Sequence, residues 1–450
     1  MNLISKYNIP VPRYTSYPTV PFWDKTPTID EWKKLVKDCF NATNSKDGIT
    51  LYIHLPFCES LCTYCACNTR ITVNHKVEEP YINTVLKEWD LYLELFNEKP
   101  LIREIHLGGG TPTFFTAENL KKLIQGILDK SNVAPNAEFS FEAHPANTTI
   151  GHLITLYQLG FKRISFGIQD FDDKVQDAIN RYHSFEEVKS IVDQCRAVGY
   201  TSVNFDLVYG LPFQTYASML DTVEKVIALK PDRIAFYSYA HVPWIKPGQR
   251  KFTEKDLPVD DDKRKLYELG KELFLKNAYK EVGMDHFALE NDELFAAMKN
   301  KKLHRNFMGY TANYTALLIG LGVSSISDTW TGFAQNIKTV EEYQECINSG
   351  ELAVTRGHVL NEEDLILRKH ILNIMCHLET KWDKPETQCE ALYQGIERLT
   401  ELQKDGLVEV HPYHLKVTET GKAFLRNICM CIDARYWRKT PEAKTFSSAV

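Results

Sequence analysis

Residues 53–68 read Ile53-His54-Leu55-Pro56-Phe57-Cys58-Glu59-Ser60-Leu61-Cys62-Thr63-Tyr64-Cys65-Ala66-Cys67-Asn68, and they place four cysteines within ten positions, directly after an apolar run typical of a β-strand. Gaps of three and then two residues let one short loop surround a compact cluster with soft thiolates, the ligands that iron–sulfur centres take. Three thiolates on a four-iron cluster leave one iron open. An open position marks a reactive centre, as it does in catalytic zinc sites.

Two other uses of these cysteines stay open at this point. A structural zinc site could use four nearby thiolates, but such sites usually pair two Cys-x-x-Cys knuckles across a longer spacer, and this sequence has no second knuckle. A disulfide framework fits less well, because the chain has 11 cysteines in 450 residues and shows no charged and then apolar secretory leader.

The composition is that of an ordinary globular protein, with 44% hydrophobic and 25% charged residues. The length allows one large domain and a smaller one. No apolar run approaches the roughly 20 residues that span a bilayer, so we expect no membrane partner. The formal net charge of −6 argues against a nucleic-acid surface, which normally carries a basic stripe. We expect a cytoplasmic protein in a reducing compartment.

Between residue 49 and about residue 326, short β-rich runs alternate with helical patterns, which predicts βα units and a parallel sheet. Strands are expected at residues 49–54, 104–107, 138–142, 163–167, 201–206 and 232–238. Helices are expected at residues 81–96, 117–129, 185–198 and 217–229. The pattern predicts an α/β fold, an incomplete (β/α)6 barrel similar to a TIM barrel, with functional residues at the carboxyl ends of the strands.

Three parts of the chain are expected. Residues 1–47 form an amino-terminal segment, too polar and too rich in proline to be a domain, which we expect to cover the substrate. Residues 48–360 form the barrel with an extension. Residues 361–450 form a small, mainly helical, winged-helix-like domain that packs on the barrel. Its expected elements are helices at 362–375 and 386–402, a hairpin of 407–410 and 415–418, and a closing helix to about residue 427.

Glycine and polar residues follow the predicted strands. Gly108-Gly109-Gly110-Thr111 comes after the second strand, where glycines let the backbone approach a ligand closely. Glu142 ends the third strand, and Asp206 ends the fifth. Gln169 follows the fourth strand, and Arg181 lies shortly after it. Each of these residues alone could be a tight connection or a solvated surface group. Their recurrence at consecutive strand ends favours one shared site.

These residues resemble one family, the oxygen-independent coproporphyrinogen III oxidases of haem biosynthesis, within the radical S-adenosylmethionine (SAM) superfamily. The resemblance runs over nearly the whole chain. Beyond the cysteine loop and the glycine turn, it is carried by Arg13-Tyr14-Thr15-Ser16-Tyr17-Pro18-Thr19, Gly167-Ile168-Gln169-Asp170-Phe171, Asp206-Leu207-Val208-Tyr209-Gly210-Leu211-Pro212, Tyr239-Ala240-His241, Gly283-Met284-Asp285-His286-Phe287-Ala288, His304-Arg305-Asn306-Phe307 and Arg426-Asn427-Ile428-Cys429-Met430. The cysteine loop alone is specific only to the superfamily. The amino-terminal motif, Cys67 and the last three motifs narrow it to this family.

The resemblance implies roles for individual residues. Cys58, Cys62 and Cys65 would ligate a [4Fe-4S] cluster, and Cys67 would stand beside it without ligating. Family members hold two SAM molecules. The first is expected to contact Tyr52, Gly109 and Glu142. The second is expected among Tyr64, Gly110, Thr111, Gln169, Arg181 and Asp206, with Ala240 and Ile326 near the adenine. Catalytic roles are expected for Cys67, Tyr14 and Arg13, the last as a partner of a substrate propionate.

The activity that the resemblance implies is the conversion of two propionate side chains of coproporphyrinogen III to vinyl groups, giving protoporphyrinogen IX without oxygen. An electron passed through the cluster would cleave SAM, and the 5′-deoxyadenosyl radical would take a hydrogen from the propionate β-carbon, after which carbon dioxide and one electron leave. Expected partners are this substrate and a low-potential electron donor such as flavodoxin or ferredoxin, and the expected state is a monomer.

The sequence departs from the common family pattern at two positions. Ala66 replaces a usual glycine, and Met308 stands where glutamine often follows Asn306-Phe307, on the substrate side.

The alternative function is that of a superfamily relative, either a haem-binding chaperone or an anaerobic haem-processing enzyme. A chaperone typically lacks the Arg13-Tyr14-Thr15-Ser16-Tyr17-Pro18 segment and the fourth cysteine, and both are present here. Vinyl porphyrinogen and 5′-deoxyadenosine would identify the oxidase, and stably bound haem the chaperone. A zinc-knot interaction protein would be colourless rather than brown.

Overall fold

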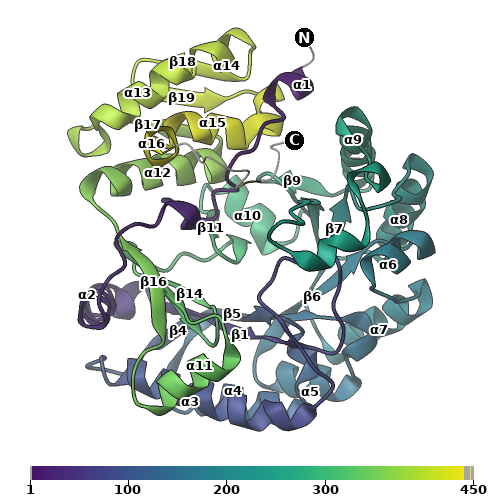
Figure 1. The fold of residues 1–450 in the computed structure, drawn as a ribbon, viewed down its shortest axis with the longest axis vertical. Helices are drawn as coiled ribbons and strands as arrows, with labels where there is room; N and C mark the ends of the chain where they lie inside the picture. The colour runs from purple at the N-terminus through teal and green to yellow at the C-terminus, as the bar shows by residue number, and fades with distance from the viewer. Residues whose placement is uncertain (1–2, 440–445, 447–450) are drawn as a thin grey trace.

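The computed structural model describes residues 3–439 and residue 446. Its main sheet has twelve strands, and six consecutive parallel strands form its centre. In spatial order these are β1 (Ile49–Leu55), β4 (Leu101–Gly109), β5 (Asn132–Ala143), β6 (Phe161–Gln169), β7 (Ser202–Tyr209) and β8 (Arg233–Ser238). All six predicted strands are confirmed, and with them the incomplete (β/α)6 barrel (Figure 1).

Helices cover the outer face of this sheet. Four of them were predicted, namely α3 (Glu78–Leu93), α4 (Ala117–Leu128), α7 (Phe185–Val198) and α8 (Tyr216–Leu229). Two short ones were missed, α5 (Ile150–Gln158) and α6 (Asp173–Ile179). Helix α7 shows how its ends are set: Ser184 and Glu187 form a reciprocal capping box at the start, and Gly199 takes the left-handed conformation (φ 113°) that ends it.

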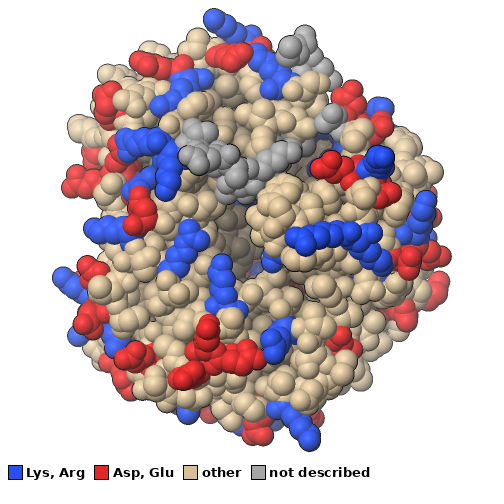
Figure 2. Space-filling view, viewed as in Figure 1, with Lys and Arg blue, Asp and Glu red and all other residues tan. Residues whose placement is uncertain are grey.

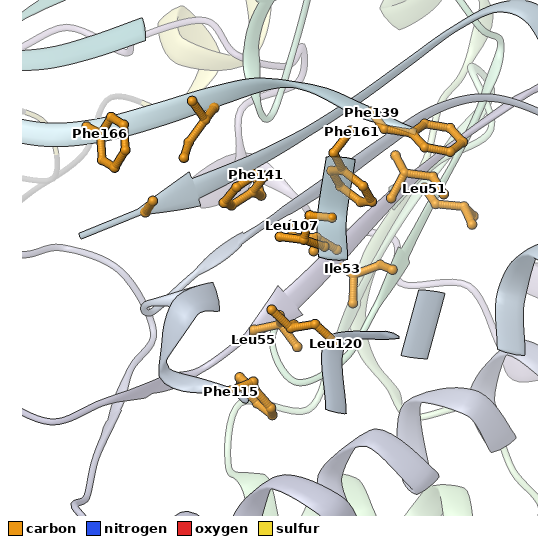
Figure 3. Close-up of a cluster of buried hydrophobic side chains, with 14 of the residues drawn as sticks. Leu51, Ile53, Leu55, Leu107, Phe115, Leu120, Phe139, Phe141, Phe161 and Phe166 are labelled. Atoms are coloured by element: carbon orange, nitrogen blue, oxygen red, sulfur yellow. The ribbon is translucent and has the colours of Figure 1, made fainter. Parts of the chain in front are cut away.

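Alternation along the strands sorts side chains onto two faces of the sheet, because neighbouring residues of a strand point to opposite sides. Leu51, Ile53 and Leu55 of β1 belong to the main apolar core with Phe139 and Phe141 of β5 (Figure 3). The residues between such apolar positions are polar. They are Thr50, Tyr52, His54, Glu104, His106, Glu138, Ser140, Glu142, Arg163, Ser165, Asn204 and Asp206. The inner face of the barrel is therefore polar, and it leads to the carboxyl ends of the strands.

Further strands extend both edges of the barrel. Strand β13 (Leu317–Leu321) pairs parallel with β1, and β14 (Ile326–Asp328), β15 (Gly332–Asn336) and β16 (Val354–Val359) follow antiparallel. At the other edge, β10 (His286–Ala288) and then β9 (Lys280–Val282) add antiparallel to β8. The helices between these strands are α9 (Asp260–Lys276), α10 (Glu293–Lys299) and α11 (Val340–Asn348), and a separate hairpin joins β11 (His304–Asn306) to β12 (Gly309–Thr311).

The amino-terminal segment holds α1 (Leu3–Tyr7) and a long helix, α2 (Ile29–Asp47), that the sequence reading missed. Helix α2 starts with a capping box between Thr28 and Glu31 and buries Trp32, Val36 and Phe40. The spacing of four residues puts these apolar side chains on one face, so a generally polar composition still encodes a packed helix.

The carboxyl-terminal elements lie beside the barrel, in yellow and light green in Figure 1. They are α12 (Glu362–His377), β17 (Glu379–Lys381), α13 (Glu390–Arg398), α14 (Thr400–Lys404), β18 (Val408–His411), β19 (His414–Val417), α15 (Leu425–Ile432) and α16 (Ala434–Arg438). The first predicted helix and the hairpin are confirmed. The predicted helix 386–402 is wrong in extent, because two helices meet at Leu399 and a 3-10 turn of Pro385–Thr387 precedes them. The closing helix also lies later than predicted.

A second apolar core joins the two ends of the chain. Val11, Tyr14 and Tyr17 pack into it with residues of α12, α13 and α15. Residues 1–2, 440–445 and 447–450 of the expected parts lie outside the described residues. Among the described helices, none combines the length and the apolar character that crossing a membrane requires.

Candidate active site

The cysteine loop leaves β1 at the carboxyl end of the barrel and runs between two short parallel strands, β2 (Phe57–Cys58) and β3 (Arg70–Ile71). Backbone bonds fix its ends and middle. The amide of Arg70 donates to the Pro56 carbonyl (2.8 Å), and the amide of Thr63 donates to the Ile179 carbonyl (2.9 Å). The loop therefore presents its thiols over the inner face of the barrel rather than away from it.

The glycine turn at the end of β4 lies directly against the end of β1 and the start of the cysteine loop. Gly109 has φ 108°, and a Cβ there would come within 2.6 Å of the His54 ring. A Cβ on Gly110 would come within 2.6 Å of the Pro56 backbone, whose neighbour Leu55 accepts a hydrogen bond from the Gly110 amide (2.8 Å). Only glycine fits this close approach. The turn then places the Thr111 hydroxyl 3.3 Å from the Cys58 Sγ.

One cavity of about 350 Å³ gathers most of the predicted site. The predicted residues that line it are Cys58, Cys62, Tyr64, Cys65, Cys67, Gly109, Gly110, Thr111, Glu142, Gln169, Arg181 and Asp206. They come from the cysteine loop, from β4, β5, β6 and β7 and the turn after β4, and, for Arg181, from the connection between α6 and α7. The structure thus brings together residues that lie up to about 150 positions apart in the sequence, as the carboxyl ends of parallel strands allow.

Arg181 and Asp206 occupy one side of this cavity. The Arg181 Nε donates to the Gly167 carbonyl (2.8 Å), and its Nη1 lies 3.6 Å from the Cys62 Sγ. The Asp206 carboxylate accepts from the Ser165 hydroxyl (3.0 Å) and from the Asn204 amide (2.9 Å). Burial, with the nearby charge of Glu142, raises the pKa of Asp206.

Glu142 lines the same cavity from the end of β5. One carboxylate oxygen accepts from the Gly109 amide (3.2 Å), and the other lies 3.5 Å from the His106 Nε2. Burial alone would raise the pKa of Glu142, but His106, the Gly109 amide and His54 together hold it below its usual value. Glu142 therefore carries a negative charge at the cavity wall at neutral pH.

Three of the predicted cofactor contacts lie just behind this lining. The Tyr52 hydroxyl is 3.0 Å from the His54 Nδ1. Ala240 is linked to the loop through Gln249, whose side chain donates to the carbonyls of Ala240 (3.1 Å) and Tyr64 (3.3 Å). Ile326 lies against Gly320, the residue of β13 that pairs with Tyr52.

Arg13 and Tyr14 lie elsewhere. Tyr14 is buried and donates its hydroxyl proton to the Asp433 carboxylate (3.0 Å). Arg13 donates to the Ser238 carbonyl (2.8 Å) and lines a different and larger cavity, of about 540 Å³, together with Asp285 and Arg426. The larger cavity holds none of the loop cysteines, so we place the reactive centre in the smaller one. The catalytic roles of Arg13 and Tyr14 stay predictions.

The sequence reading missed the polar residues beneath the cavity. His106 and Arg163 each contact Ser140, and His106 also reaches Glu142. Their signal is present in the sequence, because each stands at an alternate position between apolar residues of a strand. A polar residue at such a position marks a polar barrel interior when the other face is covered by helices.

Comparison with known proteins identifies the family. The model described as "Radical SAM superfamily" matches residues 52–226. A protein of Pseudomonas aeruginosa named oxygen-independent coproporphyrinogen III oxidase is 36% identical, over 96% of this chain and 95% of its own length. One of the same name from Escherichia coli strain K12 is 34% identical, over 100% of this chain and 98% of its own length. The chain belongs to the oxygen-independent coproporphyrinogen III oxidase family.

A solved structure of this family agrees with the assignment. Coproporphyrinogen III oxidase from Escherichia coli, described as a radical SAM enzyme, superposes with a TM-score of 0.88 at 34% identity, covering 94% of this chain and 97% of that one. The resemblance inferred from the motifs is confirmed, as is the radical SAM barrel.

The cysteine loop fits an iron–sulfur cluster. All three expected ligands are free thiols on one cavity wall. Hydrogen bonding by Cys67 is the main reason that the pKa of Cys65 is lowered to about 6, whereas burial raises the pKa of Cys58 to about 11. Within residues 3–439 and 446, no three His, Cys, Asp or Glu side chains are arranged to hold a single metal ion. Thiols spaced around a cavity suit a polynuclear cluster, in which each thiolate ligates a different iron.

Proposed function

We propose that this protein carries out the oxygen-independent oxidative decarboxylation of two propionate side chains of coproporphyrinogen III, giving protoporphyrinogen IX for haem biosynthesis. One observation carries the proposal: the loop thiols, the glycine turn, Glu142 and Asp206 all face one cavity at the carboxyl ends of the barrel strands. The match to coproporphyrinogen III oxidases along nearly the whole chain supports the substrate and the reaction.

The cofactors are a [4Fe-4S] cluster, which Cys58, Cys62 and Cys65 would hold, and SAM. When bound, they supply a carbon radical able to remove hydrogen from an unactivated carbon. The chain itself binds and orients. The ionised Glu142 would offer an oxygen to the ammonium group of SAM, and the carbonyl groups of the glycine turn would accept from the same group, while the amides of Gly109 and Gly110 hold the turn in place.

We infer a second SAM on the other side of the cavity, among Tyr64, Gly110, Thr111, Gln169, Arg181 and Asp206. The charges suit such a ligand, since a guanidinium can pair with the methionine carboxylate and Asp206 can accept from ribose hydroxyls or an amino group. Cys67, on the exposed part of the loop, would act next to this second ligand.

The surroundings suit an anionic substrate. Figure 2 shows a hollow near the middle of the visible face, with Lys and Arg side chains beside it and a group of Asp and Glu side chains farther below. Positive charge at the rim of a recess raises the local concentration of a carboxylate-bearing ligand such as coproporphyrinogen III. The cavity wall also includes the apolar side chains of Leu61, Phe114 and Val208, which suit a pyrrole macrocycle.

We further propose that the protein works as a cytoplasmic monomer that takes electrons from a low-potential donor such as flavodoxin or ferredoxin. Its 11 cysteines are all free thiols, which suits a reducing compartment. We also propose three functional parts, residues 1–47, 48–360 and 361–450, the first of which covers the substrate. The second apolar core packs the last part against the amino-terminal segment and against Val282, Leu294 and Tyr310 of the middle part.

An anaerobic turnover assay tests the proposed function. Reconstituted protein, SAM, a chemical reductant and coproporphyrinogen III should give protoporphyrinogen IX and 5′-deoxyadenosine. Cys62→Ser, which cannot hold the cluster, is the matched control and should give neither. Recovery of unchanged coproporphyrinogen III from a preparation that still cleaves SAM would refute the proposal that it is the substrate.

A further inference from the structure

Four neighbouring strands place a row of polar side chains directly below Glu142. In the sheet register, Tyr52 of β1 is paired with His106 of β4, His106 with Ser140 of β5, and Ser140 with Arg163 of β6. Side chains of paired residues in adjacent strands lie on the same face of a sheet. The row therefore crosses the barrel interior on the same inner face as Glu142, which is two residues further along β5.

One assignment of the protons satisfies every polar contact in this row. Arg163 has only donors, and its Nη2 donates to the Ser140 Oγ (3.0 Å). The Ser140 Oγ lies 2.8 Å from the His106 Nδ1, and the other ring nitrogen, Nε2, faces a Glu142 oxygen at 3.5 Å. A carboxylate only accepts, so both ends of the ring are satisfied when Nδ1 accepts from Ser140 and Nε2 carries a proton toward Glu142.

Packing fixes the plane of the imidazole. The Tyr52 ring stacks on His106 with 6.1 Å between centroids and 19° between planes, and the Tyr52 hydroxyl is held by His54. The far end of the row is also anchored, because Arg163 forms a buried ion pair with Glu138 (2.5 Å). Only 12% of the His106 side chain is exposed. These contacts hold the ring between Ser140 and Glu142.

We propose that His106 is a positioning residue for SAM binding: supported by Ser140 and Arg163, it directs its Nε2 proton at Glu142 and so aims that carboxylate at the ammonium group of SAM. The inference rests on the proposed function in taking SAM as the ligand of Glu142. It adds a residue that touches no cofactor itself. Outer partners of this kind typically change ligand affinity by about 10- to 100-fold when removed.

The electrostatics of Glu142 agree with this role. After the opposing effect of burial, the contact with His106 is the strongest of the influences that lower the pKa of Glu142. His106 reaches one carboxylate oxygen and the Gly109 amide reaches the other, so both oxygens have a fixed direction. The 3.5 Å separation is longer than a formed hydrogen bond. Such contacts often tighten when the ligand is bound.

The test measures SAM affinity by equilibrium dialysis on cluster-reconstituted protein. His106→Ala should weaken binding of the first SAM by about 10- to 100-fold at unchanged iron content. His106→Gln should recover much of the loss, because its amide donates from nearly the place of Nε2. His106→Asn, whose shorter amide does not reach that place, should behave like His106→Ala. A structural role alone would not separate glutamine from asparagine in this order.

Two further variants keep the test decisive. Ser140→Ala removes the partner of His106 Nδ1 and the acceptor of Arg163 Nη2 but leaves the imidazole in place, so it should weaken SAM binding by a smaller factor than His106→Ala. His152→Ala on α5 is the matched control, since His152 is also a buried, doubly hydrogen-bonded histidine but contacts Thr149 and Phe115 instead of the site. It should bind SAM as the wild type does. Nitrogen NMR of histidine-labelled protein should show the His106 proton on Nε2.

The outcomes separate this inference from the proposed function. Equal SAM affinity in wild type, His106→Ala and His106→Gln would overturn the positioning role, as would a proton found on Nδ1 and not on Nε2. Those results would not bear on the proposed function, which is tested by the turnover of coproporphyrinogen. The opposite result is also informative. If the SAM affinities of the variants follow the predicted order but the wild-type protein makes no vinyl product, the proposed function is overturned and the role of His106 stands.

Discussion

Replacing Gly167 by alanine should close the inferred second SAM site without harming the fold. Gly167 lies on β6 beside Arg181 and Gln169. A Cβ there would come within 2.8 Å of the Arg181 Nη2 and 2.7 Å of the Gln169 Nε2, closer than such atoms approach. The position requires no left-handed backbone, so the added methyl group acts on these two side chains and not on the strand.

The expected size of the effect follows from the bonds that Arg181 would lose. Its guanidinium must move away from the Gly167 carbonyl (2.8 Å) and the Cys62 Sγ (3.6 Å), which now hold it in place. Losing one charge-assisted hydrogen bond to a ligand costs about 1.5–3 kcal/mol. That corresponds to about a 10- to 150-fold weaker affinity.

Equilibrium dialysis with labelled SAM measures the effect. Wild-type protein should bind two SAM molecules per chain, and Gly167→Ala should bind one at concentrations that saturate the wild type. Gly151→Ala is the control, because a Cβ there meets only the Thr149 Oγ1 at an ordinary 3.5 Å. Two bound molecules of unchanged affinity in Gly167→Ala would refute the reasoning, and a wild type that binds only one would remove the second site.

Three other predictions concern the cluster and the fold. Cys62→Ser should lose the brown chromophore because a hydroxyl is a hard ligand, whereas Cys67→Ser should keep it and lose much activity; bleaching of Cys67→Ser would show that the ligand assignment is wrong. Burial raises the pKa of Asp433 from 3.8 to about 6, so between these pH values the folded state keeps a proton that the unfolded state releases. The free energy of unfolding should therefore fall by about 3 kcal/mol as the pH rises from about 4 to about 6. The free energy of unfolding in urea, measured between about pH 4 and pH 6, should fall less steeply with pH in Asp433→Asn than in the wild type. The same dependence on pH in both proteins would contradict this prediction. Glu88 accepts from the Gly322 amide (2.7 Å), Tyr343 (2.6 Å) and Asn336 (2.6 Å), so Glu88→Gln should lower stability by about 2 kcal/mol or more, and an unchanged melting temperature would count against this network.

The barrel could be predicted because its strands repeat a local pattern. Each strand alternates apolar residues with polar ones and is followed by a helix with visible apolar spacing, so the six parallel strands needed no long-range information. Their carboxyl ends must meet at one edge of the sheet. For that reason Glu142 and Asp206, far apart in sequence, could be expected at a common site.

Other features depend on contacts that a sequence does not display. Strand β13 reads as an apolar run, but only the tertiary fold pairs it with β1 across more than 250 residues. The position of Tyr14 follows from packing between the two ends of the chain and from its bond to Asp433. The break at Leu399 arises in a stretch that has helical spacing on both sides. His106 was visible as a polar residue in a strand, but its role needed the register of β4 against β5.

Deuterium transfer tests the central claim most directly. Coproporphyrinogen III deuterated at the β-carbons of its propionates is incubated without oxygen with reconstituted protein, SAM and reductant, and the nucleoside product is analysed by mass spectrometry. The proposed function predicts deuterated 5′-deoxyadenosine together with a vinyl porphyrinogen. Unlabelled 5′-deoxyadenosine beside unchanged tetrapropionate substrate would contradict it.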